Sequence, residues 1–236
     1  MTVAEFARFI DHTLLRPDST RRDARRICEE ARTHGFAAAC ILPAWVADAA
    51  EVLNGSETAV CTVVGFPHGN APAQAKAAEA ATAVADGATE IDMVVNISAI
   101  KSGADLIVMD EIASVVEVCG AGDALVKVIL ECAYLTDAEK RRIAQMAEEA
   151  GADFVKTSTG FAVPGEGKPV GATVEDVRLL RATVGEDIGV KAAGGIRSVA
   201  DARAMIDAGA ARLGTSAGIA LIRAFREGTE MSNSGY

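Results

Sequence analysis

Two apolar runs of the chain each carry a lysine where a buried strand would ordinarily carry an aliphatic residue. Lys156 lies in FVKTSTGF (154–161), and Lys191 lies in IGVKAAGGIR (188–197). Lysine is rarely buried unless a partner holds it in place. If both side chains project inward from neighbouring strands, which lie ~4.7–4.9 Å apart, their ammonium groups approach to roughly 5 Å. At an effective dielectric constant of about 20, two such charges repel by roughly 3 kcal/mol, which is more than two pKa units.

A lysine that loses its proton through such repulsion becomes a nucleophile. A neutral amine attacks a carbonyl carbon, and the iminium that forms withdraws electrons from the neighbouring carbon. Partial desolvation favours the neutral amine as well. The two runs therefore predict Schiff-base chemistry at Lys156 or at Lys191, and the residues by themselves leave open which of the two is the nucleophile.

Other polar residues lie toward the carboxyl ends of apolar runs, where a parallel barrel gathers its functional groups. Asp92 is in EIDMVVN (90–96), and Lys127 is in ALVKVILE (124–131). With the two lysines above, they would form a cluster contributed by four consecutive strands. Further candidates at such positions are Asp11, Asn96, Ser158, Thr215 and Ser216.

Two glycine-containing segments predict an anion site. AAGGIR (192–197) follows one run, and LGTSAG (213–218) leads into a helical pattern. Phosphate sites in (β/α)₈ barrels are frequently built from the loops after strands seven and eight and from a helix N-terminus. Glycines let backbone N–H groups approach the anion, and Thr215 or Ser216 would donate a hydroxyl. Arg197 would add a positive charge or face the solvent.

A regular alternation of strands and helices positions these residues. Thr2 with Glu5 and Thr136 with Glu139 have the spacing of helix capping boxes. Eight strand–helix units in about 250 residues predict an α/β protein with a (β/α)₈ TIM barrel, and a doubly wound open sheet is the alternative. The expected strands are 9–15, 36–42, 58–66, 90–96, 124–131, 153–160, 189–195 and 211–218. The expected helices are 2–9, 19–32, 43–53, 72–85, 104–119, one from 136, 173–183, one from 198, and 217–226.

The chain is expected to form one domain. No linker rich in Pro, Gly or Ser and no run of charges interrupts the alternation of elements. We therefore predict a single catalytic barrel domain at 1–227, followed by a flexible polar tail at 228–236 that ends in Tyr236.

The composition favours a cytoplasmic protein that acts on a small molecule. Half of the 236 residues are apolar and only 4% are aromatic, so the core must consist of aliphatic residues and alanine. The net charge of -10 argues against a nucleic-acid partner, which would require a basic face. No stretch of ~18 apolar residues predicts a membrane span, and the N-terminus lacks the features of a signal peptide.

Metal and cofactor motifs are missing from the sequence. The five cysteines have no zinc-finger spacing and read as free thiols of a reducing compartment. The histidines His12, His34 and His68 are scattered, and no GxGxxG occurs, so we expect no metal and no dinucleotide cofactor. His68 could line the pocket, and Cys40 could face it or be a small buried core residue.

Together these motifs resemble the deoxyribose-phosphate aldolases. The resemblance runs in order from about residue 10 to residue 216, through IDHTLL, GFPHG, EIDMVVN, LVKVILE, FVKTSTGF, VKAAGGIR and GTS. It implies a class I aldolase that needs no metal, on a (β/α)₈ barrel. The implied reaction is the reversible cleavage of 2-deoxy-D-ribose 5-phosphate to D-glyceraldehyde 3-phosphate and acetaldehyde, in deoxyribose catabolism.

The resemblance also implies a role for each matching residue. Lys156 would form the Schiff base, Lys191 would lower the pKa of Lys156 and take part in proton relay, and Asp92 would be the acid–base partner. Lys127 would contact substrate hydroxyls. The 5-phosphate would be held by Gly194, Gly195, Gly214 and Ser216, and Asp11, Thr159 and Thr215 complete the candidate substrate-binding set. A homodimer is implied at the level of the family, and in some members a terminal tyrosine, here Tyr236, reaches the active site.

Two other functions fit part of the pattern. A phosphate-binding isomerase that works by acid–base chemistry would explain the glycine segments but would not need paired lysines. A non-catalytic sugar-phosphate sensor would keep the glycine segments and tolerate loss of Lys156. The combination of Asp92, Lys156 and Lys191 favours the aldolase.

Overall fold

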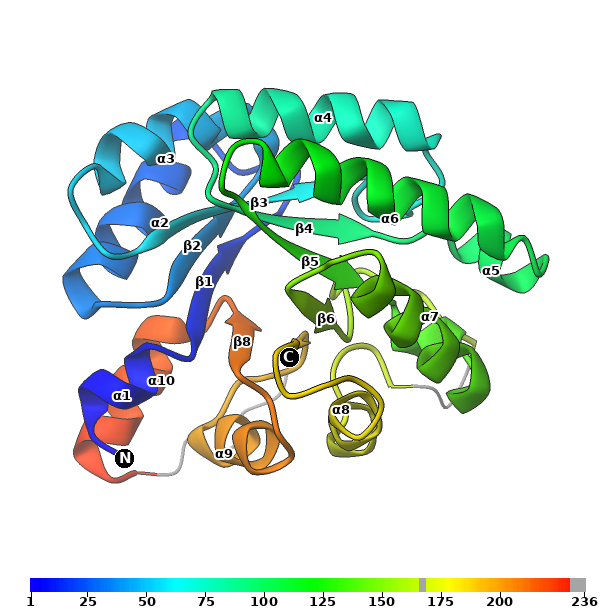
Figure 1. Ribbon diagram of the computed structural model, residues 1–236. Coiled ribbons are helices and arrows are strands. Elements are labelled where there is room, and N and C mark those ends of the chain that lie inside the picture. The colour runs from blue at the N-terminus through cyan, green and yellow to red at the C-terminus, as the bar shows by residue number, and fades with distance from the viewer. Residues whose placement is uncertain (166–168, 230–236) are drawn as a thin grey trace.

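Eight parallel strands close into a barrel at the centre of the molecule (Figure 1). The computed structural model describes residues 1–165 and 169–229. Each strand pairs with the next along the chain, and β8 pairs with β1. The (β/α)₈ barrel predicted from the sequence is confirmed, and the alternative of an open doubly wound sheet is wrong. The strands are β1 (Ile10–Leu14), β2 (Ala38–Ile41), β3 (Ala59–Val64), β4 (Glu90–Val94), β5 (Leu125–Ile129), β6 (Phe154–Lys156), β7 (Gly189–Ala193) and β8 (Arg212–Thr215).

Helices surround the barrel on its outer side (Figure 1). Two short 3₁₀ turns, η1 (Pro43–Trp45) and η2 (Cys132–Tyr134), follow β2 and β5. The α-helices are α1 (Val3–Ala7), α2 (Arg21–His34), α3 (Val46–Leu53), α4 (Ala73–Ala85), α5 (Ile97–Lys101), α6 (Asp105–Gly120), α7 (Asp137–Glu149), α8 (Val174–Arg181), α9 (Val199–Asp207) and α10 (Gly218–Glu227). Within the described ranges, no helix is long and apolar enough to cross a membrane.

Local side-chain caps explain where several helices begin. Thr2 and Thr136 form the capping boxes that their spacing predicts. Thr20 forms a third with Asp23, so α2 begins at Arg21 rather than at residue 19. At its other end, α2 stops at His34 because Gly35 adopts the left-handed conformation that terminates a helix.

Two expected elements differ markedly in extent from those observed, and one observed helix was not expected. The helix expected over 43–53 begins as the 3₁₀ turn η1 and becomes α-helical at Val46. The strand expected over 153–160 is paired only as far as Lys156, and the TSTG segment that follows is a loop. The short helix α5 was not predicted, and the side chain of Asn96 caps it. Of the tail expected at 228–236, residues 230–236 lie outside the described residues, and so does Tyr236.

The larger apolar cluster lies between the strands and the helices, and a small one that contains Cys40 and Cys61 lies inside the barrel. Successive strand residues point to opposite faces, so on β4 the buried Ile91 and Met93 pack in the apolar core, while Glu90 and Asp92 point inward. The interior of such a barrel is ordinarily filled by branched aliphatic side chains. Here several inward positions are charged, and this makes the interior of the barrel the place to look for chemistry.

Candidate active site

Seven charged side chains fill the interior of the barrel. Lysine and carboxylate side chains of this kind are rarely buried without partners. Asp11, Asp92, Lys127 and Lys191 are completely buried here, and Lys156 is 3% exposed. Such burial is stable only where opposite charges pair. The seven come from six strands: Asp11 (β1), Glu90 and Asp92 (β4), Lys127 (β5), Lys156 (β6), Lys191 (β7) and Arg212 (β8).

Asp92 is the centre of this cluster. Its Oδ1 accepts a hydrogen bond from Nζ of Lys127 over 2.8 Å. Its Oδ2 accepts from Nζ of Lys156 and from Nζ of Lys191, each over 2.7 Å. Register places these groups together, since Asp92 lies opposite Lys127 and Lys156 lies opposite Lys191 on paired strands. One carboxylate therefore connects the three lysines that the sequence analysis singled out.

Two further carboxylates complete the pairing. Asp11 lies 2.5 Å from Nζ of Lys191 and 2.6 Å from a guanidinium nitrogen of Arg212. Glu90 lies 2.6 Å from Nζ of Lys127 and 2.8 Å from Arg212. Glu90 and Arg212 were missed by sequence reasoning. Glu90 shares the inward face of its strand with Asp92, two residues away, and that spacing is a signal that could have revealed it.

The ion pairs shift the ionisation of the cluster strongly. Burial alone would raise the pKa of Asp92, but the lysines around it outweigh burial and hold that pKa well below its usual value. The pKa of Asp11 falls to about 2, because Lys191, Lys127 and Arg212 outweigh burial in the same way. Burial would lower the pKa of Lys191, yet Asp11 and Asp92 raise it above its usual value. The pKa of Lys127 is likewise raised against the effect of burial, chiefly by Asp92.

The sequence predicted that the ammonium groups of Lys156 and Lys191 would face each other directly, and this is wrong in one respect. The two lysines are neighbours in register, as expected, but both contact the same Oδ2 atom of Asp92. A carboxylate from a strand more distant in the sequence lies between the two ammonium groups. Lys191 therefore keeps its proton more firmly than a free lysine does.

A pocket of about 250 Å³ opens at the carboxyl ends of β1, β6, β7 and β8. Lys156 is the lysine of the cluster that lines it. Asp11, Asp92, Lys127 and Lys191 do not line it and lie buried inside the barrel. The other predicted site residues on the pocket wall are Thr159, Gly194, Gly195, Gly214, Thr215 and Ser216. A wider groove of about 680 Å³ between α2 and α10 shares Thr13, Leu14 and Ser216 with this pocket but is lined by none of the lysines.

The glycines of the pocket are required by their surroundings. Gly194 has a φ of 85°, and a Cβ placed on it would lie 2.9 Å from the Cα of Gly171. At Gly214 a Cβ would lie 3.3 Å from Cε of Lys191, so the missing side chain leaves room for the stem of that lysine. The wall beside them is formed by Gly195, also at positive φ, and by Ser216, two residues before α10 begins. This combination of backbone and helix terminus suits an anion.

The hydroxyl of Thr215 is used in hydrogen bonds within the protein rather than being free for a ligand. Its Oγ1 donates to the carbonyl oxygen of Ile196 over 2.8 Å and accepts from the N–H of Ala217 over 3.0 Å. The side chain therefore joins the loops after β7 and β8. Ser216 is exposed at the pocket and is the hydroxyl available to a ligand there.

Glu131, just after β5, is a third residue that sequence reasoning missed. It is 1% exposed and has a φ of 57°, a left-handed conformation that is uncommon for residues other than glycine. Its Oε2 accepts from the N–H of Thr159 over 3.0 Å and from the Thr159 hydroxyl. That hydroxyl also accepts from the N–H of Phe161 over 2.9 Å. Glu131 thus holds the loop that follows Lys156 and forms part of the pocket wall.

The side chains whose roles the sequence left open fall in two places. Cys40 is completely buried in the barrel, in the small apolar cluster that also contains Cys61. His68 is exposed and lines a neighbouring cavity of about 320 Å³ with Glu131, Thr159 and Phe161 rather than the pocket of Lys156.

Potential metal ligands do occur inside the barrel. Ligand atoms of Cys40, Cys61 and Asp92 lie within 4.8 Å of one another, as do those of Asp11, Cys61 and Glu90. All three carboxylates of these groups already bind lysine or arginine side chains. A cation would have to displace those positive charges, so the site is electrostatically suited to anions and polar neutral groups instead.

Comparison with known proteins points to one family. The sequence profile described as DeoC/LacD family aldolase matches residues 6–225. A deoxyribose-phosphate aldolase of Caldanaerobacter subterraneus subsp. tengcongensis is 52% identical over 227 residues, which are 96% of each chain. A protein of the same name from Geobacillus sp. is 50% identical and is covered over 98% of both chains.

Solved structures agree with this. The deoxyribose phosphate aldolase of Aeropyrum pernix, described as a unique tetramer, superposes with a TM-score of 0.86 at 34% identity. The superposition covers 95% of this chain and 92% of that one. An aldolase designated QR15 superposes with a TM-score of 0.86 at 38% identity, over 94% of this chain and 96% of the other.

Proposed function

The chain belongs to the DeoC/LacD family of aldolases and is a carbon–carbon lyase of the deoxyribose-phosphate aldolase type, and we propose that it works through a Schiff base on Lys156. The reaction is the reversible cleavage of 2-deoxy-D-ribose 5-phosphate to D-glyceraldehyde 3-phosphate and acetaldehyde. The rival functions, an acid–base isomerase and a non-catalytic sensor, fit neither the family nor the buried set of lysines.

The observation that carries the assignment is the position of Lys156. It is the lysine of the cluster that lines the pocket, and Asp92 is its carboxylate partner. Lys191 and Lys127 are each bound by more than one carboxylate and are completely buried. Because their pKa values are raised, both keep their protons. A Schiff-base nucleophile must reach the substrate and release a proton, and Lys156 is the best placed to do both.

The cluster supports each charge change of the reaction. Attack of Nζ of Lys156 on the substrate aldehyde gives a carbinolamine, which loses water to form an iminium. The positive charge of the iminium forms beside the carboxylate of Asp92. The C3 hydroxyl then gives its proton, through water, to the carboxylate of Asp92 as the C2–C3 bond breaks, which releases D-glyceraldehyde 3-phosphate. The electron pair of that bond passes to the iminium to form an enamine. Asp92, through water, then returns the proton to the enamine carbon, while Lys191 stays protonated beside it. Water hydrolyses the resulting iminium, which releases acetaldehyde and the free amine of Lys156. Positioned proton transfer of this kind contributes about 10²–10⁴-fold.

The remaining candidates act on binding or on position. The loops with Gly194, Gly195, Gly214 and Ser216 bind the 5-phosphate at the start of α10 and so orient the carbon that reacts. Lys127 and Asp11 do not line the pocket. We assign them to holding Asp92 and Lys191, in place of the direct substrate contacts that the resemblance implied.

Trapping of the intermediate tests the assignment. Borohydride reduction in the presence of acetaldehyde should leave a stable ethyl group on Lys156, identified by peptide mass spectrometry. Lys101, an exposed lysine paired with Glu139, is the internal control and should stay unmodified under the same mild conditions. An unmodified Lys156, or label on Lys191 alone, would refute the proposal.

Location and assembly complete the proposal. We propose a cytoplasmic enzyme that forms homo-oligomers, with a homodimer as the first expectation. The Aeropyrum pernix relative is described as tetrameric, so sedimentation velocity is the measurement that distinguishes the two assemblies.

A further inference from the structure

Arg212 is the first residue of β8, at the end of the strand opposite the pocket, yet its side chain belongs to the charged cluster. Register aligns it with the catalytic strands: Lys156 pairs with Lys191, and Lys191 pairs with Arg212. Lys156 and Arg212 are therefore two strand spacings apart, which is about 10 Å. The Arg212 side chain is 16% exposed, so solvent screens its charge only weakly.

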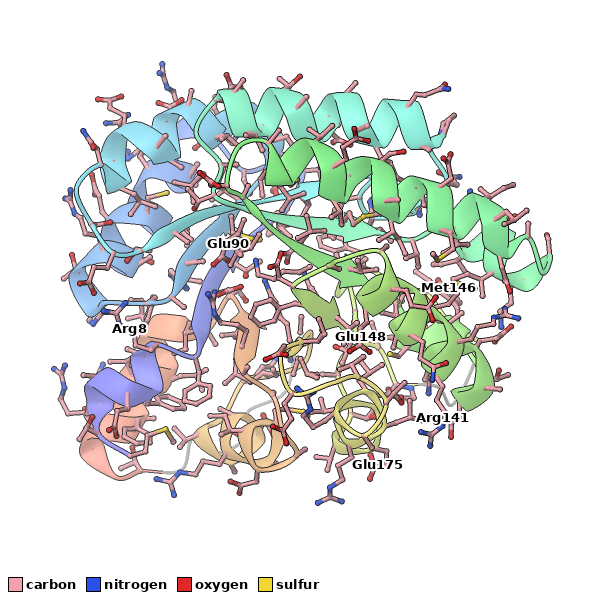
Figure 2. All side chains as sticks on the ribbon, in the orientation of Figure 1. Arg8, Glu90, Arg141, Met146, Glu148 and Glu175 are labelled. Carbon is pink, nitrogen blue, oxygen red and sulfur yellow. The ribbon has the colours of Figure 1, made fainter. Side chains whose placement is uncertain are left out.

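Two carboxylates fix the guanidinium. Nη1 donates to Oδ1 of Asp11 over 2.6 Å and to Oε2 of Glu90 over 3.2 Å, and Nη2 donates to Oε1 of Glu90 over 2.8 Å. Figure 2 shows Glu90 among the strands, whereas Arg8, Arg141 and Glu175 lie toward the outside of the molecule. Arg212 thus bridges the first and the fourth strand across the barrel.

The neighbouring residues are shaped to hold Arg212 in place. Its guanidinium carbon lies 5.7 Å from the centre of the Phe154 ring, a cation–π contact. Phe154 can occupy that position because residue 189 is glycine, where a Cβ would lie 2.1 Å from the ring. This arrangement leaves the guanidinium little freedom to turn away from the cluster.

A count of charges shows what Arg212 adds. The cluster has three carboxylates, Asp11, Glu90 and Asp92, and four cationic side chains when all are protonated. Without Arg212 the two signs would balance. With it, the cluster carries one positive charge in excess, and the loss of one proton restores the balance.

The lysine that can remove the excess charge by losing a proton is the one that contacts a single carboxylate. Lys191 and Lys127 are each held by at least two carboxylates. Lys156 is held by Asp92. We propose that Arg212 is a positioning residue for the Schiff-base chemistry, whose buried charge, held by Asp11 and Glu90, favours release of the proton from Lys156. The inference rests on the proposed function, since it assigns a cause to the reactivity of the same lysine.

Other groups face the two ends of this arrangement. Glu131 and Cys40 lie near Lys156 in addition to Asp92, Lys127 and Lys191, and Lys127 and Lys191 lie near Arg212 in addition to its two carboxylates. Cys61 is a thiol, because burial raises its pKa well above the usual value. All of these groups stay unchanged in the variants below, so they contribute equally to each.

Paired charge variants test the inference. The rate of reductive ethylation of Lys156 by acetaldehyde and cyanoborohydride is measured as a function of pH. Arg212→Gln should move the midpoint of the rate profile upward by about one pH unit, and Glu90→Gln should move it downward by a similar amount. Arg212→Lys, which keeps the charge, should leave the midpoint in place. The double variant Arg212→Gln/Glu90→Gln should return it close to that of the unsubstituted protein.

Shifts of opposite sign cannot come from a merely structural defect. If Arg212→Gln and Glu90→Gln move the midpoint in the same direction, or if neither moves it while circular dichroism shows a folded barrel, the inference is overturned. Competitive acetylation of Lys156 by acetic anhydride reports the same midpoint without any Schiff base. Shifts seen by acetylation with no ethylation at Lys156 would uphold the role of Arg212 and refute the proposed function.

Discussion

Nζ of Lys156 donates to Oδ2 of Asp92 over 2.7 Å, so the amine proposed to attack the carbonyl begins as one half of a buried ion pair. The contact matters for the chemistry, because the carboxylate favours the positive iminium once the Schiff base has formed. Two neighbouring cations, Lys127 and Lys191, bind the same carboxylate.

Removal of the nearest of those cations should slow the reaction in a manner that depends on pH. Lys191→Leu should reduce the rate of reductive ethylation of Lys156 at neutral pH on the order of tenfold, with partial recovery at higher pH. The reason is that Lys191 is protonated and shares Oδ2 of Asp92 with Lys156.

The matched control for this variant is Lys101→Leu, which removes an exposed lysine that pairs with Glu139. It should leave the pH profile unchanged. If Lys191→Leu lowers the rate by the same factor at every pH, Lys191 acts on the proton transfers alone and does not affect the ionisation of Lys156.

The glycine loops should be separable from the lysine chemistry. Gly194→Ala should raise KM for 2-deoxy-D-ribose 5-phosphate at least about tenfold, because Gly194 has a positive φ and a Cβ would press on Gly171 and Gly160. Ethylation of Lys156 by acetaldehyde alone should change much less, since acetaldehyde has no phosphate.

Gly120→Ala serves as the control, because a Cβ at that position would meet no atom within 4 Å and the residue ends α6. KM should stay the same in this variant. An equal loss of both activities in Gly194→Ala would instead indicate that the loops position the catalytic cluster rather than the phosphate.

The acid stability of the barrel should depend on Asp11. Its pKa is lowered from 3.8 to about 2, since Lys191, Lys127 and Arg212 outweigh the effect of burial. A carboxyl whose folded pKa lies below its unfolded value contributes its stabilisation fully above the unfolded value. That contribution, about 2 kcal/mol here, is lost as the pH falls from about 4 toward 2.

Denaturant unfolding at a series of acidic pH values measures this contribution. Asp11→Asn should flatten the fall of unfolding free energy between about pH 4 and pH 2. Asp207→Asn, at the exposed end of α9, should leave the slope as it is. An Asp11→Asn protein with an unchanged acid slope would show that Asp92 or other carboxyls dominate the acid transition.

The sequence predicted the fold and most of the cluster because both follow from local patterns. The alternation of apolar runs with capped helices indicates the barrel, and a lysine or aspartate in an apolar run is visible without a structure. Thr2 and Thr136 are examples of such local patterns, since both form the capping boxes that their spacing indicates. Inward direction follows from strand periodicity once the fold is known.

Partners from distant strands could not be read in the same way. Arg212 looks like an ordinary residue at the start of a strand, and only the closure of β8 onto β1 brings it to Asp11 and Glu90. The expected repulsion between Lys156 and Lys191 was incomplete for the same reason. The position of Asp92 between them depends on strand register and side-chain length, neither of which the sequence shows directly.

Glu131 and Thr159 should behave as one unit in substrate binding. Glu131 accepts hydrogen bonds from both the N–H and the hydroxyl of Thr159, and this fixes the loop between Lys156 and Phe161. Glu131→Gln keeps the side-chain shape but not the full acceptor capacity, and Thr159→Val removes the hydroxyl. Each single change should raise KM by a few-fold up to about tenfold with a smaller effect on kcat, since each removes one charge-assisted hydrogen bond.

A double-mutant cycle decides whether the two residues act together. The double variant should be little worse than either single one, with a coupling free energy of about 1 kcal/mol in kcat/KM. Burial raises the pKa of the Glu131 carboxyl, so ionisation of this group costs stability as the pH rises past its ordinary pKa. Glu131→Gln removes that cost. At neutral pH the variant should therefore lose less unfolding free energy than the lost hydrogen bonds alone would cause. If the effects of the two substitutions on kcat/KM are strictly additive, Thr159 contacts the substrate independently of Glu131. Glu131 would then stabilise only the backbone that follows β5.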